Sequence, residues 1–171
     1  MRQLESYEEE KMKLNLGCGK DIREGWVNVD WVDAPGIDMV LDISDHLPFP
    51  SNSVSEVLVS HVLEHIIDWE AVVIEIWRIL KPGGTVKIIV PYGLELQTYH
   101  KRFFDEKTLD GFIEGSQFYD SPSLEGHPVF RCLRMDVDRR FPFAWHVKKY
   151  LGVMPPLGPK AIISWDLEKI A

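Results

Sequence analysis

Two glycines and an aspartate near the start of the chain have the residue types and spacing of a nucleotide-binding turn. Gly17 and Gly19 follow a short apolar segment, Lys13 to Leu16, and Asp30 ends a second one, Trp26 to Val29. Glycines directly after a strand let the backbone approach a ligand without an intervening Cβ atom. A carboxylate at the tip of the next strand is where an α/β sheet holds ribose hydroxyls. The expected ligand is therefore a nucleoside derivative.

The glycine spacing also separates two kinds of nucleoside cofactor. The dinucleotide fingerprint requires a third glycine three residues after Gly19, and Ile22 occupies that position. The third glycine serves helix–strand packing behind a bound pyrophosphate. Its absence counts against NAD and favours a nucleoside cofactor without phosphates.

Longer stretches of the sequence resemble the motifs of one enzyme family. LNLGCG followed by VNVD is similar to motifs I and II of the class I S-adenosylmethionine-dependent methyltransferases, and LPFPSNSVSEVLVSHVLEHI and EIWRILKPGGTVKIIVP resemble the middle of the type 11 branch. The likeness covers Leu14 to Pro91. It implies a Rossmann-like α/β fold with a mostly parallel seven-stranded sheet, S-adenosyl-L-methionine as cofactor, and methyl transfer to an oxygen, nitrogen or carbon nucleophile of a small-molecule or sugar-type acceptor.

The resemblance implies which residues bind the methionine end of the cofactor. The cofactor-binding loop would consist of Gly17, Cys18 and Gly19, with its backbone N–H groups facing the carboxylate of the cofactor. The side chain of Cys18 is expected to be a small space-filler rather than a nucleophile. Asn15 stands where the family usually has an acidic residue, which makes it a weaker partner for the cofactor's ammonium group.

The resemblance places four further residues at the adenosine end. Asp30 would accept the ribose hydroxyls, and Trp31 would either lie against the ribose or adenine or pack in the core. Asp42 and Ile43 match the position that holds the adenine amino group and ring, although Asp42 is also typical of a turn.

Two residues at the end of the fourth strand are expected to bind the cofactor. Ser60 and His61 leave this strand beside the transferable methyl group in this family. His100 lies in a segment, HKRFFDEKTLDGF, that resembles the one passing over the acceptor pocket, and histidine titrates near neutral pH. His100 and His61 are therefore the candidate catalytic residues, although methyl transfer by in-line positioning needs no base.

The residues from His61 to His65 also form a literal H-x-x-E-H. This is the inverted zincin motif, which requires a long helix. Here the motif directly follows a predicted strand, so we expect no bound metal and rank a zinc hydrolase third. The second-ranked alternative is a non-catalytic S-adenosylmethionine-binding or partner subunit, because Asn15 is unusual and several helices are missing.

The chain is expected to form a single methyltransferase-like domain over residues 1–171, with 1–12 as a frayed extension. Only six residues separate Gly19 from Trp26, whereas a parallel crossover normally needs about a dozen or more. One face of the sheet should then lack helices, and its apolar strands would need a cover. We expect a homodimer to supply it, with residues 141–156 folding back as the alternative. The predicted strands are 13–16, 26–29, 37–41, 54–60, 85–90, 129–137 and 161–167, and the predicted helices are 66–80 and 105–113.

Composition excludes several other classes of protein. The chain is 45% hydrophobic, and no apolar run reaches the roughly 18 residues of a membrane span. A net charge of -8 argues against nucleic acid as a partner. Two cysteines form no disulfide framework, so a cytoplasmic location is expected.

Overall fold

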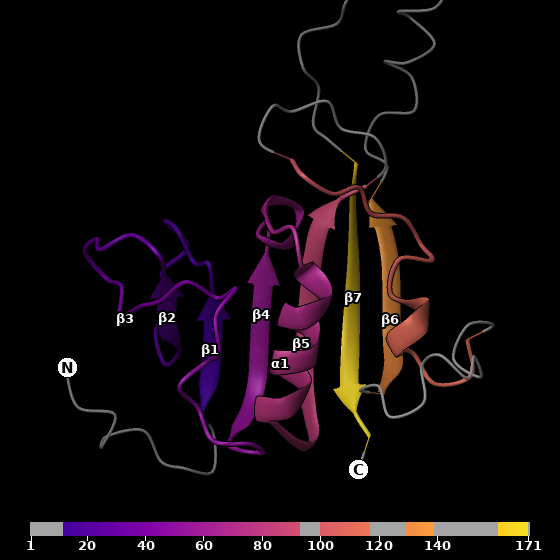
Figure 1. Cartoon of the computed structure of the whole chain (residues 1–171), viewed down its shortest axis with the longest axis horizontal. Coiled ribbons are helices and arrows are strands. Elements are labelled where there is room, and N and C mark those ends of the chain that lie inside the picture. Colours follow the sequence, from indigo (N-terminus) through magenta and orange to yellow (C-terminus); the bar gives the residue numbers. More distant parts are fainter. Residues whose placement is uncertain (1–11, 93–99, 117–128, 139–160, 171) are drawn as a thin grey trace, which may run out of the picture.

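A single seven-stranded sheet runs through the protein, with strands in the order β3-β2-β1-β4-β5-β7-β6 (Figure 1). The computed structural model describes residues 12–92, 100–116, 129–138 and 161–170. The strands are β1 (Lys13–Leu16), β2 (Val27–Asp30), β3 (Met39–Val40), β4 (Val54–Ser60), β5 (Leu80–Pro91), β6 (Phe130–Asp138) and β7 (Ile162–Lys169). The helices in these ranges are α1 (Trp69–Ile79) and two 3-10 turns, η3 (Leu63–His65) and η4 (Asp110–Phe112).

The strand pairing is mixed. Strands β3, β2, β1, β4 and β5 are mutually parallel, whereas β7 is antiparallel to both of its neighbours, β5 and β6. The expected Rossmann-like, seven-stranded and mostly parallel sheet is therefore confirmed, with one reversed strand inside it. Because the strand order changes direction between β1 and β4, this is the switch point where doubly wound sheets bind ligands.

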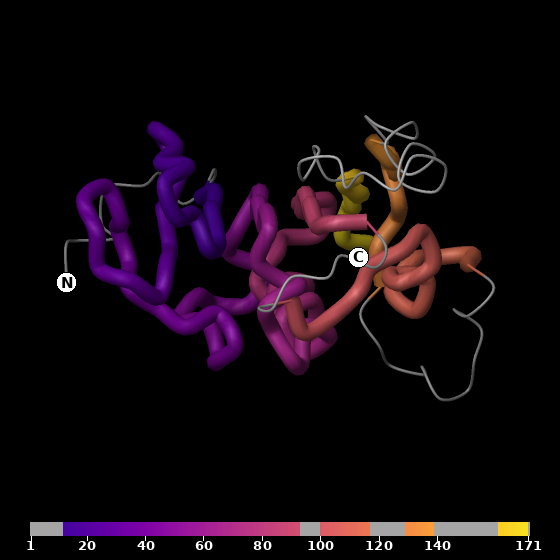
Figure 2. The backbone as a smooth tube through the Cα atoms, turned by 90° about the horizontal axis from the view of Figure 1, so that it is seen from above, coloured from indigo at the N-terminus to yellow at the C-terminus, as the bar shows by residue number. Residues whose placement is uncertain are grey.

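One face of the sheet forms the hydrophobic core with α1. The helix buries five apolar side chains, and Asp68 caps its start by accepting a hydrogen bond from Ala71 N at 3.3 Å. The segment 100–116 packs on the same side of the sheet as α1 (Figure 2). There Trp69 contacts Phe104, with 5.4 Å between the ring centroids. The helix residues buried in this core are Trp69, Val72, Val73, Ile76 and Ile79.

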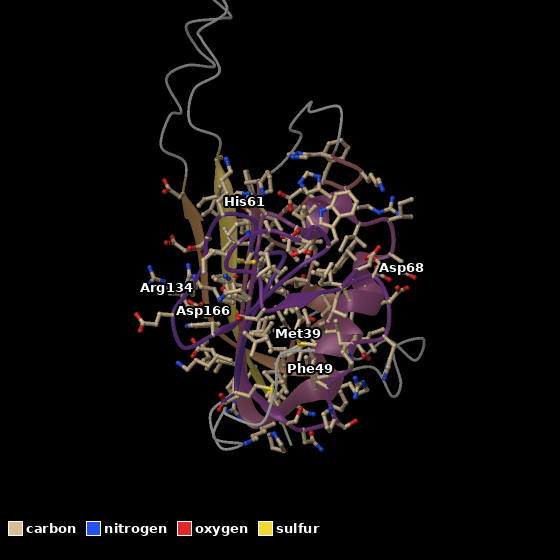
Figure 3. The ribbon with its side chains drawn as sticks, turned by 90° about the vertical axis from the view of Figure 1, so that its left-hand side faces the viewer. Met39, Phe49, His61, Asp68, Arg134 and Asp166 are labelled. Carbon is tan, nitrogen blue, oxygen red and sulfur yellow. The ribbon has the colours of Figure 1, made fainter. Side chains whose placement is uncertain are left out.

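The opposite face of the sheet is polar. Figure 3 shows Arg134 and Asp166 on the side of the sheet away from Asp68 and α1. Ion pairs join neighbouring strands across this face: Lys13–Glu56 at 2.5 Å, Lys87–Asp166 at 2.9 Å and Arg131–Glu168 at 3.1 Å. The expectation of an uncovered apolar face is therefore wrong for the described residues, because successive side chains of a strand alternate between the two faces.

A loop takes the place of the first crossover helix on this polar face. Asn15 and Asn28 are paired in register on β1 and β2, and both are buried. Asn15 Nδ2 donates to Asp21 O at 2.6 Å and to Asn28 Oδ1 at 3.2 Å. Asn28 Oδ1 also accepts from Arg23 N at 2.9 Å, and its Nδ2 donates to Arg23 O at 3.1 Å. The two amide side chains thus form hydrogen bonds with backbone N–H and C=O groups of the loop. The short crossover predicted from the sequence is confirmed.

Two predicted helices differ from the structure. The helix expected over 66–80 begins only at Trp69. The helix expected over 105–113 is a series of turns that includes η4. Asp105 Oδ1 accepts hydrogen bonds from Lys107 N at 3.0 Å and Thr108 Oγ1 at 2.9 Å, and such local side-chain bonds compete with a helix.

Strand β5 is longer than its predicted range, 85–90. It begins at Leu80, so the KPGG sequence expected to precede it lies within the strand, beside a register shift between Val54 and Glu56 of β4. Predictions for residues 1–11, 117–128 and 139–160 lie outside the described residues. Within the described ranges, no helix has the length and apolar character needed to cross a membrane.

Candidate functional site

A pocket of about 810 Å³ opens at the carboxyl ends of β1, β2, β3 and β4, next to the switch point of the sheet. Its walls come from the residues that directly follow these strands, from the segment between η3 and α1, and from one lysine beyond β5. The lining residues are Gly17, Asp30, Trp31, Leu41, Asp42, Ile43, Ser44, His61, Val62, His65, Ile66, Ile67, Asp68 and Lys101.

The glycine turn after β1 depends on the absence of side chains. Gly17 has a φ of +65°, and a Cβ atom there would lie 2.3 Å from Val62 Cγ2. Gly19 has a φ of +51° and its N–H donates to Asp30 Oδ2 at 2.8 Å. Both positions therefore need glycine for its conformation, and Gly17 also needs it for space.

Asp30 joins the glycine turn to the pocket. The residue is 8% exposed, and its Oδ1 accepts from Val32 N at 3.1 Å while Oδ2 accepts from Gly19 N. These bonds fix the carboxylate at the end of β2. Because a carboxylate has about four acceptor sites, two remain for hydroxyl groups of a ligand.

The residues after β3 form a second polar corner of the pocket. Asp42 Oδ1 accepts from Ser44 N at 2.9 Å, and Ile43 is buried beside it. Trp31 is 76% exposed and lines the same pocket, so it does not pack in the core. Its indole ring is available to a flat ligand group.

The pocket carries more negative than positive charge. Asp30, Asp42 and Asp68 contribute three carboxylates, and Lys101 contributes one ammonium group. In a concave site such an excess attracts a cationic ligand.

The structure brings together some of the predicted site residues and separates others. Gly17, Asp30, Trp31, Asp42, Ile43 and His61 line the pocket. Asn15, Cys18, Gly19, Ser60 and His100 do not contribute to its walls. The amide of Asn15 instead donates to the backbone of the 20–25 loop, at Asp21 O, and to Asn28 Oδ1.

Cys18 behaves as the expected space-filling residue. It is buried, and this burial raises the pKa of its thiol, with the negative charge of Asp30 adding to the effect. A raised thiol pKa keeps the group protonated and unreactive near neutral pH.

The H-x-x-E-H sequence does not form a zincin helix. His61 leaves β4 with a φ of +56°, and only Leu63–His65 form a single 3-10 turn. His61 N donates to Ile89 O at 2.8 Å, and its Nδ1 lies 3.5 Å from Glu64 Oε1. The long helix that places both histidines of that motif on one metal is absent from this described segment.

Sequence reasoning missed the pocket residues between η3 and α1. Ile66, Ile67 and Asp68 fell within the helix predicted over 66–80, and Asp68 was not recognised as both cap and lining residue. Lys101 directly follows His100, in the segment that was expected to pass over the acceptor pocket. This position in the sequence could have identified Lys101 as a lining residue. Lys101 N donates to Glu64 O at 2.7 Å, so this segment is tied to η3.

Comparison with known proteins agrees with this geometry. Residues 18–88 match the model of the methyltransferase domain family. The Burkholderia thailandensis 1,6-didemethyltoxoflavin-N1-methyltransferase with bound S-adenosylhomocysteine is 15% identical, with a TM-score of 0.60, and the match covers 94% of this chain and 71% of that chain. The YcgJ protein of Bacillus subtilis is 13% identical, with a TM-score of 0.60 and coverage of 98% and 96%.

A third similar structure comes from the complex between the Haloferax volcanii Trm112 methyltransferase activator and a methyltransferase. It is 19% identical, with a TM-score of 0.57, and the match covers 97% of this chain and 85% of that chain. No curated protein sequence matches. The family match and these folds confirm the resemblance to the class I methyltransferases.

Proposed function

We propose that this chain, which carries the methyltransferase domain over residues 18–88, binds S-adenosylmethionine in the pocket and transfers its methyl group to a small-molecule nucleophile. One observation carries the proposal most directly. Asp30 is a buried carboxylate at the end of β2, held by two backbone N–H groups, and it lines the pocket at the switch point of the sheet. This is the place where a ribose with two hydroxyls is held.

The other lining residues support the same orientation of the cofactor. Asp42 and Ile43 would contact the adenine, with Trp31 against its ring face, and Gly17 would allow the methionine end to approach the backbone. The excess of carboxylates favours a ligand with a positively charged sulfonium and ammonium group.

The chemical step needs an acceptor in line with the sulfur–methyl bond. Positioning alone supplies much of the reduction in the barrier. Of the two histidines predicted to act as a base, His61 lines the pocket and His100 does not. His61 is therefore the better placed to receive a proton from the acceptor.

Substitution of Asp30 tests the proposal. We expect Asp30→Ala to weaken S-adenosylhomocysteine binding by about 1.5–3 kcal/mol, the range for hydrogen bonds to a charged group. Titration calorimetry measures the affinity, and circular dichroism checks that the variant is folded. The matched control is Asp33→Ala, an exposed carboxylate of the same turn that does not line the pocket. No binding to the unmodified protein, or equal affinity in all three proteins, would overturn the proposal.

A second candidate function is a cofactor-binding or partner subunit without activity of its own. Two observations favour it: one similar structure is a complex with a methyltransferase activator, and Trp31, Val32 and Val40 are exposed near one edge of the sheet. An assay of S-adenosylhomocysteine formation by the full chain, given S-adenosylmethionine and a panel of small acceptors, distinguishes the active enzyme from the inactive subunit. Tight cofactor binding with no turnover on any of them would favour the partner subunit.

A further inference from the structure

Three potential metal ligands, two from η3 and one from the segment that begins at His100, converge beside the pocket. One ligand atom from each of Glu64, His65 and His100 lies within 4.8 Å of the other two. We propose that this Glu64–His65–His100 cluster binds a divalent transition-metal ion. The proposal revises our expectation from the sequence of no metal, because the third ligand lies far beyond the H-x-x-E-H stretch.

The backbone holds the cluster in place. Glu64 and His65 are neighbours in η3, and the carbonyl oxygen of Glu64 accepts from Lys101 N at 2.7 Å and Arg102 N at 3.3 Å. Arg102 then donates through Nη2 to Ile67 O at 2.7 Å, on the other side of the turn. These bonds fix the start of the 100–116 segment against η3. His100 is thereby placed next to His65, with 5.1 Å between the ring centroids.

Glu64 provides an independent sign of a missing ligand. The residue is 1% exposed, and no hydrogen-bond donor among the described residues reaches its Oε2 atom. Its Oε1 atom lies 3.5 Å from His61 Nδ1. A buried carboxylate oxygen without a partner is costly, and a bound cation would satisfy it.

The donor set indicates the class of ion. Two imidazole nitrogens and one carboxylate oxygen suit zinc, iron or manganese and leave coordination positions open, whereas magnesium prefers oxygen ligands alone. Donor atoms on a tetrahedral zinc ion lie about 3.4 Å apart, given bonds of about 2.1 Å. The donor atoms of the cluster lie up to 4.8 Å apart, so they have to approach one another by up to about 1.4 Å on binding zinc.

A role for the ion rests on the proposed function. His65 also lines the pocket, so an open coordination position would face the acceptor. A hydroxyl bound there would lose its proton more readily to His61, since a metal ion lowers the pKa of a bound hydroxyl. The oxygen would form a bond to the methyl carbon as the sulfur–methyl bond breaks, and the electron pair of that bond would remain on the sulfur of S-adenosylhomocysteine.

Metal binding is measured directly on the full chain, without an affinity tag and after removal of metals by a chelator. Titration with Co²⁺, followed by its visible absorption, and with Zn²⁺, followed by calorimetry, should each show one equivalent bound. Glu64→Gln, which keeps the shape of the side chain, and His100→Ala should each weaken binding at least 10-fold. His46→Ala is the matched control, because His46 is exposed and pairs with Glu75 at 2.9 Å, outside the cluster.

Binding that His46→Ala retains and that Glu64→Gln and His100→Ala lose would support the site. Absence of stoichiometric binding by the unmodified protein would overturn it, as would unchanged affinity in Glu64→Gln and His100→Ala. S-adenosylhomocysteine titration of the same metal-free protein keeps the two proposals apart. Cofactor binding without metal binding would contradict only the proposed metal site. Metal binding without cofactor binding would contradict only the proposed function.

Discussion

Gly17 is the position in the glycine turn where a side chain has least room. We expect Gly17→Ala to lower the free energy of unfolding by about 2–5 kcal/mol, because it adds left-handed strain of about 1–2 kcal/mol to overpacking of about 1–3 kcal/mol against Val62. Urea denaturation measures this loss. Gly19→Ala is the matched control, because its φ is also positive but no atom lies within 4 Å of its added Cβ.

The steric part of this loss can be separated from the backbone part. Val62→Ala removes the two methyl groups nearest the added Cβ and leaves Val62 Cβ at 3.3 Å. The double variant should therefore recover the overpacking part but not the left-handed strain. Equal losses in Gly17→Ala and Gly19→Ala, or strict additivity in the double variant, would contradict the contact.

The loop that replaces the first crossover helix depends on Asn28. Its side chain bonds Asn15, Arg23 and the carboxylate of Asp38, the last at 3.1 Å. Removing it leaves several buried polar groups without partners, so we expect Asn28→Ala to cost about 2–4 kcal/mol of unfolding free energy. Urea denaturation should show a lower midpoint with an unchanged slope. Lys20→Ala, an exposed change in the same loop, should stay within about 0.5 kcal/mol of the unmodified protein.

A second connection joins α1 to the loop after β3. Glu75 accepts from Leu47 N at 2.8 Å and from Arg78 Nη2 at 2.7 Å, and Arg78 also donates to Phe49 O at 2.9 Å. The hydrogen bonds and charge of Arg78 lower the pKa of Glu75, and the hydrogen bond from Arg78 to Glu75 raises the pKa of Arg78.

This lowered pKa predicts a pH dependence of stability. A carboxylate whose pKa is lower in the folded state stabilises the protein above its unfolded pKa of about 4.3, and that contribution is lost as pH falls through the folded pKa. Glu75→Gln should thus unfold more easily at pH 7, and its stability should converge on that of the unmodified protein in acid. Urea titrations from pH 7 to pH 3 measure this. Glu70→Gln, the loss of an exposed carboxylate of the same helix, is the matched control.

The sequence predicted the strands better than the orientation of their side chains. The apolar runs of β1, β2, β4 and β5 were recognisable, and the glycines with Asp30 located the pocket. The position of Asn15 along β1 matched the family, but its hydrogen bond to Asn28 depends on the register of β1 and β2, which the sequence alone does not give. The link between η3 and the 100–102 segment is a pair of long-range backbone hydrogen bonds, which no local pattern predicts.

At the scale of the whole molecule, the helix-poor face bears on the oligomeric state. The sequence predicted a homodimer that would cover an apolar surface, and the described part of this face carries cross-strand ion pairs instead. Such a face does not require a partner. We expect light scattering at several micromolar to give the 19.8 kDa of one chain. A stable dimer at that concentration would show that another surface associates.

The two edges of the sheet bear on how the protein avoids aggregation. An exposed edge strand can template the addition of strands from other molecules and start a fibril. Here β3 offers only two residues, Met39–Val40. The other edge, β6, is longer but is broken by a register shift, and its exposed Leu133 and Met135 alternate with the charged residues Arg134 and Asp136. Charged residues that alternate with apolar ones on an edge strand oppose the addition of further strands. We therefore expect both edges of the described sheet to resist strand addition by other molecules.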